Sequence, residues 1–345
     1  MARTLAEVYR RFGEVDAAGT LYERVAVAVS ESAAALRAVE AAPARRRRPA
    51  LILAALHDLA IAGRAPALAA AYAARDGDAA ATAAVDTLLN ETDEVAVIAA
   101  RRTTRTGETG RCAVLYPAIA EAARRAGADA VGLIDVGCSA GLNLTVDRVA
   151  IAYDNGQALG DPSSPVRHTA SVVGDRPVPA RAMPEVVARI GVDLDPVDVT
   201  DPDDARWLRA CLPPEQVSVL DAELALAATA PPHLLRGDVI DLLPEAFARV
   251  PDDVLPVVTT TWALRDFSLE QRLRFLHRLD DAATRRPVAW VSAEGVGVAP
   301  AIPTFGDRRA SGHSIIGVAV FEHAALRAEG VGRTWSQGRM LSWLA

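Results

Sequence analysis

The sequence contains no lysine, so arginine supplies every permanently positive side chain. Cysteine is also scarce, with 3 in 345 residues, at Cys112, Cys138 and Cys211. Their odd number and wide spacing argue against a disulfide framework, and no CxxC or HExxH pattern indicates a zinc site. We therefore expect neither structural disulfides nor a metal centre.

Long apolar runs are missing as well. No stretch of about 18 apolar residues predicts a membrane span, and the opening MARTLAEVYRRFG lacks the apolar core and cleavage site of a secretory signal. A formal net charge of −7 disfavours nucleic-acid binding, which depends on neutralising phosphates. These absences predict a cytoplasmic protein with neither a membrane nor a nucleic-acid partner.

The residues present predict two lobes. A length of 345 residues is long for a single core, and 51% of the residues are hydrophobic. Residues 1–128 show helical apolar spacing, and their last predicted helix stops at Gly127. In residues 129–345, short apolar runs alternate with helical segments, which predicts an α/β domain with a mostly parallel, Rossmann-like sheet. The last two predicted strands, within 313–345, are expected to form an antiparallel hairpin at one edge.

A glycine-containing turn follows the first predicted strand, in LIDVGCSAGLNLTVDR (residues 133–148). Asp135 ends the strand, Gly137 allows a sharp bend, and Gly141 allows close approach of a ligand or tight packing of the next helix. Ser139 stands where many such loops have a third glycine, and Asn143 lies one turn into the predicted helix, within reach of a ligand. The alternative is a turn that serves packing alone.

Polar groups also end the later predicted strands. Asp193 and Asp195 can accept ribose hydroxyls, Asp238 can accept an adenine amino group, and TTTWAL (259–264) follows where chemistry often takes place. In this order the strand ends of residues 129–345 resemble those of class I S-adenosylmethionine-dependent methyltransferases. The resemblance implies that fold, with S-adenosylmethionine as cofactor. The expected cofactor-binding residues are Asp135, Gly137, Ser139, Gly141, Asn143, Asp193, Asp195 and Asp238.

One spacing departs from that pattern. The distance from Gly137 to Asp193 far exceeds the ~20 residues typical between a glycine turn and a ribose-binding acid. Either an insertion lies between them, or Asp154 takes the place of Asp193.

Whole phrases resemble one bacterial family, the domain of unknown function 2332. The matching phrases include LILAALHDLAIAG, DVGCSAGLNLTVDR, GDPSSPVR, RGDVIDLLP and TTTWAL, in the order of that family and over nearly the whole chain. The resemblance implies a helical N-terminal lobe joined to a methyltransferase-like sheet, and it implies no particular reaction. Thr261 precedes Trp262 where the family usually has histidine, which indicates a diverged member.

Four residues are candidates for catalysis. Glu108 and Arg111 form either a helix-capping pair or a carboxylate and an anion-binding arginine. Asp266 and Glu294 follow or end later strands, where they serve either as bases or as loop scaffold.

Four further residues are candidate substrate contacts: His57, Arg105, Arg148 and Trp262. A core histidine is the alternative for His57, and an ion pair with Asp147 is the alternative for Arg148. Two histidines in predicted strands are expected to be structural, His168 and His313.

Three functions remain open. The first is a methyltransferase for a small polar, anionic metabolite. The second is an enzyme on the same fold that works without the cofactor, by elimination or ring closure, for which an arginine-rich site with a carboxylate is suited. The third is a non-catalytic subunit that binds a protein partner.

Overall fold

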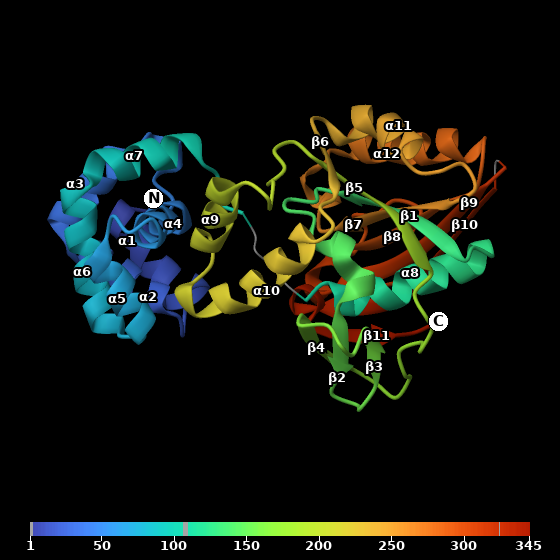
Figure 1. Ribbon diagram of the computed structural model, residues 1–345, viewed down its shortest axis with the longest axis horizontal. Coiled ribbons are helices and arrows are strands. Elements are labelled where there is room, and N and C mark those ends of the chain that lie inside the picture. The colour runs from blue at the N-terminus through green and yellow to red at the C-terminus, as the bar shows by residue number, and fades with distance from the viewer. Residues whose placement is uncertain (1–2, 106–109, 324) are drawn as a thin grey trace. The chain divides into compact units, whose positions relative to one another are not determined.

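The computed structural model describes residues 3–105, 110–323 and 325–345 (Figure 1). The chain divides into two compact units. The helical unit consists of Met1–Gly107 and Val199–Asp221, and the sheet unit of Glu108–Asp198 and Ala222–Ala345. This division differs from the predicted boundary at 128/129, because the helix Cys112–Ala126 packs on the sheet and residues from 199 onward return to the helical core.

The core of the helical unit is formed by helices that pack against one another. Its helices are α1 (Leu5–Arg11), α2 (Leu21–Glu31), α3 (Ala33–Val39), α4 (Pro49–Ile61), α5 (Pro66–Ala74), α6 (Gly77–Asn90), α7 (Thr92–Arg101) and α9 (Pro202–Ala210). The central helix α4 is buried from Leu51 to Ala60. Trp207 and Ala210 of α9 complete this core, so packing of apolar surface explains why a late segment joins an early lobe.

Side-chain caps define where several helices begin. Thr4 and Glu7 form a capping box at α1, and Asp76 accepts the N–H groups of Asp78 and Ala79 at α6. Asp201 caps α9 in the same way. Each cap satisfies backbone donors that the first helical turn leaves without partners.

The sheet unit contains an 11-stranded sheet within the described residues, in the order β3-β2-β4-β11-β10-β9-β8-β7-β1-β5-β6. Its strands are β1 (Ala130–Val136), β2 (Ala150–Tyr153), β3 (Ala158–Gly160), β4 (Arg167–Val172), β5 (Glu185–Asp193), β6 (His233–Arg236), β7 (Leu255–Thr261), β8 (Val288–Gly295), β9 (Ser314–Glu322), β10 (Ala325–Trp335) and β11 (Met340–Trp343). Its helices are α8 (Cys112–Ala126), α10 (Val217–Ala228, which begins in the helical unit), α11 (Val239–Ala248) and α12 (Leu269–Ala283). Strands β8, β7, β1, β5 and β6 are parallel, and β9 runs antiparallel to both β8 and β10. The hairpin of β9 and β10 lies inside the sheet, because β11, β4, β2 and β3 extend the sheet beyond β10, and this corrects the predicted position at one edge. The prediction of an α/β unit with a mostly parallel sheet is thus confirmed.

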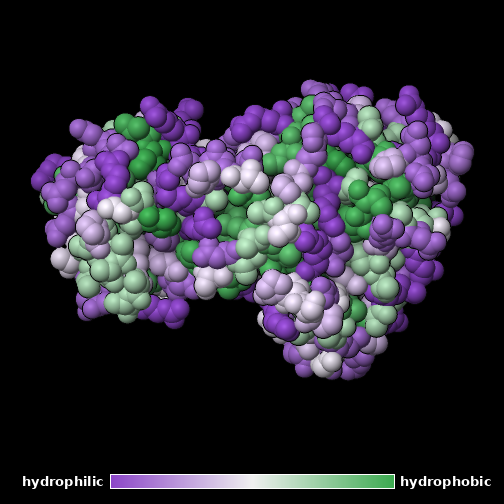
Figure 2. All heavy atoms as spheres, in the orientation of Figure 1, coloured by the Kyte–Doolittle hydropathy of each residue, from purple (hydrophilic) through white to green (hydrophobic). Residues whose placement is uncertain are grey.

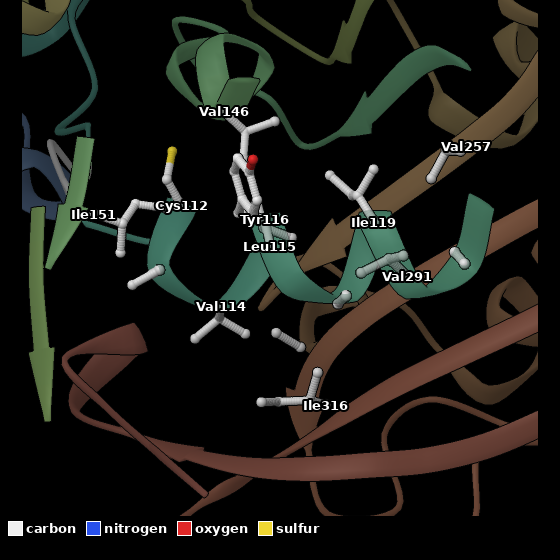
Figure 3. Packing of buried hydrophobic residues seen from close by; sticks show 14 of the residues in the cluster. Cys112, Val114, Leu115, Tyr116, Ile119, Val146, Ile151, Val257, Val291 and Ile316 are labelled. Carbon is white, nitrogen blue, oxygen red and sulfur yellow. The ribbon is translucent and has the colours of Figure 1, made fainter. Parts of the chain in front are cut away.

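Alternate residues along each central strand face two different layers, as the pleat of a strand requires. Leu133 of β1 and Val257 of β7 belong to the core cluster under α8, whereas Ile134 and Val258 belong to the cluster under α11 and α12. Figure 3 shows Val114 of α8 among the residues that pack with the first of these layers. The same alternation carries Asp135, Thr259 and Thr261 onto the α8 face of the sheet.

Two predicted elements differ in the structure. The segment after the glycine-containing turn, expected as an α-helix, forms a 3₁₀ helix at Leu142–Arg148, and strand β2 follows it directly. The last predicted strand, 333–344, is interrupted by a 3₁₀ turn at Ser336–Gly338. Ser336 and Gln337 have φ of 46° and 57° there, which breaks the extended backbone.

None of the helices in residues 3–105, 110–323 and 325–345 has both the length and the hydrophobicity of a membrane span. Helices α4 and α5 reach those criteria only as a pair, and that pair bends by 99°.

Candidate functional site

The carboxyl ends of the parallel strands form one edge of the sheet unit. Strands β1, β5, β6, β7 and β8 end here at Val136, Asp193, Arg236, Thr261 and Gly295. In open α/β sheets, ligands bind outside this edge. The polar residues that follow these ends are therefore the candidate site.

The turn after β1 is tied to the end of β5. The N–H of Gly137 donates to the carbonyl of Val192 at 2.8 Å, and the N–H of Ser139 donates to Oδ2 of Asp193 at 2.9 Å. The N–H of Val197 then donates to the Ser139 carbonyl at 3.0 Å. The segment after β5 thus lies against the turn on the side that faces β5.

The two glycines of the turn are required by the protein itself. Both have positive φ, 70° each. A Cβ on Gly137 would lie 3.0 Å from Cβ of Ala263, and a Cβ on Gly141 would lie 2.8 Å from Cγ of Pro232. Close approach of neighbouring chain, together with positive φ, accounts for glycine at both positions.

A buried hydrogen-bond network begins at Asp135. Its Oδ1 accepts the hydroxyl of Thr259 at 2.7 Å, and its Oδ2 accepts Nδ2 of Asn143 at 3.1 Å. The same amide nitrogen lies 3.3 Å from Oγ1 of Thr261. Burial raises the pKa of Asp135 to about 6, against the opposing effects of these two hydrogen bonds and of the Arg111 charge.

Arg111 extends this network toward Trp262. Its Nη1 donates to the carbonyl of Thr261 at 3.3 Å and to Oγ1 of Thr261 at 3.0 Å. Its guanidinium carbon lies 5.1 Å from the centre of the Trp262 ring, a cation–π distance. The structure therefore brings four predicted site residues together: Arg111, Asp135, Asn143 and Trp262.

Trp262 is held in a strained conformation. Its φ is 57°, rare for a residue with a bulky side chain. Its Nε1 donates to Oγ of Ser314 at 2.8 Å, and its N–H donates to the Ala293 carbonyl at 3.1 Å. Strain of this kind collects at functional sites when the surroundings enforce it.

Two supporting residues escaped the sequence analysis. Ser314 is the first residue of β9, and its hydroxyl accepts the Trp262 ring N–H. Gly338 lies close to Arg111, since a Cβ on Gly338 would be 3.3 Å from Cα of Arg111. Gly338 has φ of 101°. The run SQG before the last strand was the available signal, since glycine after two polar residues is typical of a turn.

Glu294 lies on the opposite face of the sheet, under α11 and α12. Its Oε1 accepts the N–H groups of Ala263 at 3.0 Å and Leu264 at 3.1 Å. Burial raises its pKa to about 7, partly offset by these two N–H groups. Of the two readings for Glu294, the geometry matches loop scaffold. The other candidate base, Asp266, has a side chain that is 80% exposed and lies 3.7 Å from Arg265.

The other acids predicted to hold a cofactor make contacts within the chain. Oδ1 of Asp193 accepts the N–H of Asp195, so each oxygen of Asp193 accepts a backbone donor. Asp195 forms an ion pair with Arg236. Asp238 caps α11 by accepting the N–H groups of Ile240 and Asp241.

His57 and Arg105 belong to the helical unit. Nδ1 of His57 lies 3.0 Å from Oη of Tyr22 and 3.1 Å from the Leu212 carbonyl. Burial lowers the pKa of His57 to about 4, so its ring is neutral at pH 7. The structure thus places His57 as a core histidine, which is one of the two alternatives for this residue. The N–H of Arg105 donates to Sγ of Cys211 at 3.4 Å.

Arg148 contacts the end of α10 and does not pair with Asp147. It donates to the Leu226 carbonyl at 3.4 Å and to Oγ1 of Thr229 at 2.7 Å. Asp147 instead pairs with Arg189 through two contacts of 2.7 Å. Glu108, predicted to be catalytic, lies outside the described residues.

No group of three or more His, Cys, Asp or Glu side chains in the described part of the chain could hold a metal ion. The described groups that the network brings together at this edge are hydrogen-bond donors, the Arg111 guanidinium, the Trp262 ring and the buried Asp135 carboxyl group.

The comparisons with known proteins leave the reaction open. No curated protein matches the chain, and no solved structure matches it. One family profile matches residues 6–343, and its description is an uncharacterised protein conserved in bacteria, DUF2332. Because this match covers nearly the whole chain, the protein belongs to the DUF2332 family.

Proposed function

We propose that the sheet unit is an enzyme on a methyltransferase-like scaffold that binds a small, polar, anionic metabolite at the carboxyl edge and works without an adenosyl cofactor. We propose elimination or ring closure as the reaction class, in which Arg111 holds the anionic group of the substrate and water accepts the proton that the substrate loses. One observation carries this proposal: Arg111 is held by Thr261 and Trp262 beside the buried Asp135–Asn143 network.

The donors at this edge suit an anionic oxygen. Oγ1 of Thr261 accepts from both Arg111 and Asn143, so its own O–H can be directed to a ligand. The guanidinium of Arg111 carries a permanent charge, and a guanidinium matches carboxylate, sulfate or phosphate geometrically. Because stacking on Trp262 restrains the guanidinium, less entropy is lost when a ligand binds.

Asp135 supports this site from within. Its side chain is fully buried, so it positions Asn143 and Thr259 without touching a ligand itself. A pKa of about 6 lets the carboxyl group exchange a proton near neutral pH. Asp135 can therefore take up or release a proton when the charge at this edge changes, as happens where charge develops during a reaction.

The adenosyl cofactor fits these residues less well. Asp193 is bonded to the turn, Asp195 to Arg236, and Asp238 to the start of α11. In addition, the chain at Val197 lies on the Ser139 carbonyl, where the turn faces β5. These contacts favour the reaction without the cofactor.

An S-adenosylmethionine-dependent methyltransferase is the second candidate. The order of polar strand ends favours it. The hydroxyl of Ser139 also favours this candidate, because its Oγ is buried and has no hydrogen-bond partner in the part of the chain that the structure describes. The turn and Asp193 would then hold the cofactor, which would supply the methyl group.

Titration calorimetry distinguishes the two candidates. The ligands are sulfate, phosphate, L-aspartate and S-adenosylmethionine, each titrated into the wild type, Arg111→Ala and Arg236→Ala. Arg236 is the matched control, because it is an exposed, ion-paired arginine at the same edge. Binding of an anion that is lost only in Arg111→Ala supports the proposal. Binding of S-adenosylmethionine supports the second candidate, and no heat with any ligand at millimolar concentration contradicts both.

A further inference from the structure

A second polar pair lies buried in the sheet unit. Nε2 of His168, on β4, is 3.3 Å from Oε1 of Glu223, on α10. The two side chains are only 4% and 5% exposed. Oε2 of Glu223 is buried and has no hydrogen-bond partner among the described residues. Neither residue has a role in the site described above.

The pair lies close to Arg111 and the start of α8. A Cβ on Gly110 would lie 4.0 Å from Nδ1 of His168, so the imidazole is near the residue before Arg111. Cys112, the first residue of α8, is buried beside the pair, and the charge of Glu223 contributes to raising its thiol pKa. His168 and Glu223 thus connect β4, α8 and α10.

The second half of α10 docks on the sheet unit around this pair. Ala222 and Leu226 pack against the α8-side core, and Arg148 holds the Leu226 carbonyl and Thr229. Other positions on the same helix face water: Val219 is 48% exposed, and Figure 2 shows hydrophobic surface over α10. Glu223 is therefore the acidic group that α10 places in the interior of the sheet unit.

We propose that His168 and Glu223 share one proton and act as a positioning pair, which holds α10 and the start of α8, with Arg111, in place. With one proton, the pair is neutral or internally balanced, which a buried site tolerates. Loss of that proton leaves an uncompensated carboxylate, and a second proton leaves an uncompensated imidazolium, and either charge is costly in the interior. The consequence for ligand binding rests on the proposed function, whereas the docking of α10 does not.

The direction of each titration supports a pH window. Burial raises the pKa of Glu223 to about 8 and lowers the pKa of His168. Between the ordinary pKa of histidine and about 8, the folded pair keeps a proton that the opened state releases, so the docked form weakens as pH rises. A titratable group beside the pair is Cys112 on α8, whose thiol pKa burial raises, and the charges of Asp135 and Asp147 act on the same thiol.

Hydrogen exchange of residues 222–228, measured as protection factors from pH 6.5 to 8.5, tests this proposal. The wild type should lose protection on the order of tenfold over that range, as expected for a carboxyl group with a pKa of about 8 in the docked state. Glu223→Gln should keep its protection constant, since an amide does not titrate. Asp221→Asn is the control: its carboxylate on the same helix is 49% exposed, so it should follow the wild type.

Each outcome of the hydrogen-exchange experiment supports or overturns the proposal. Constant wild-type protection, or the same fall in Glu223→Gln as in the wild type, would overturn the proposal. If Glu223→Gln does not fold, the wild-type profile and the Asp221→Asn profile still test it. Failure of anion binding in calorimetry would leave these exchange profiles unchanged, so the two proposals fail separately.

Discussion

Oδ2 of Asp193, at the end of β5, accepts the backbone N–H of Ser139, in the turn after β1, at 2.9 Å. Oδ1 of the same side chain accepts the N–H of Asp195. One carboxylate thus stabilises both the glycine-containing turn and the loop that covers it. The acid that the strand-end pattern predicts to contact a ribose therefore also shapes the turn.

The substitution Asp193→Asn should destabilise the protein by about 1–3 kcal/mol, because the amide nitrogen cannot accept the second backbone N–H. Urea denaturation at pH 7 measures this change. Asp195→Asn serves as the control, since its carboxylate is half-exposed, and it should change stability by less than about 0.5 kcal/mol. Equal effects of the two substitutions would show that Asp193 does not hold the turn.

The substitution Gly141→Ala should destabilise more than Gly156→Ala. Both glycines have positive φ, 70° and 86°. A Cβ on Gly141 meets Pro232 at 2.8 Å, whereas a Cβ on Gly156 meets nothing within 4 Å. Backbone strain of about 1 kcal/mol is common to both, and steric overlap adds about 1–3 kcal/mol only at Gly141. Thermal unfolding of the two variants measures the difference, and similar losses would rule out the overlap.

The buried Asp135 should make stability depend on pH. Its pKa is raised in the folded state, so its contribution becomes less favourable as pH rises from the ordinary aspartate value through about 6. The free-energy difference of unfolding between wild type and Asp135→Asn should therefore shift in favour of the variant by about 1–2 kcal/mol between pH 5 and pH 8. Urea denaturation at the two pH values checks this shift. A constant difference would mean that Asp135 does not titrate with a raised pKa.

Glu294 should tolerate an amide but not a truncation. Glu294→Gln keeps an oxygen for the N–H groups of Ala263 and Leu264 and removes a buried carboxyl group, so its stability at pH 8 should equal or exceed that of the wild type. Glu294→Ala leaves both donors without their acceptor and should cost about 2–4 kcal/mol. Chemical denaturation of both variants decides whether the acceptor matters; equal losses would contradict this role.

The sequence predicted much of the sheet because its signals are local. Strand β1, the turn glycines and the order of polar strand ends follow from apolar runs and glycine positions, and helix α8 ends at Gly127 as expected. The grouping of Asn143 and Trp262 also follows, since parallel strands bring their carboxyl ends to one edge, whereas Arg111 reaches this edge from the residue before α8.

Other features depend on long-range contacts that a sequence pattern does not encode. Asp193 and Asp238 look alike in the sequence, yet one binds a turn 54 residues away and the other caps its own helix. The pairing of His168 with Glu223 and of Trp262 with Ser314 arises only when distant segments meet. For the same reason, the return of α9 to the helical core lay beyond prediction.

Native mass spectrometry of the purified protein tests the central claim most directly, because it reports any small molecule that the protein retains. Wild type, Arg111→Ala and the Arg236→Ala control should be compared under the same conditions. We expect a small acidic metabolite bound to the wild type and to Arg236→Ala, and its loss in Arg111→Ala. Retention of S-adenosylmethionine, or of the same metabolite by Arg111→Ala, would contradict it.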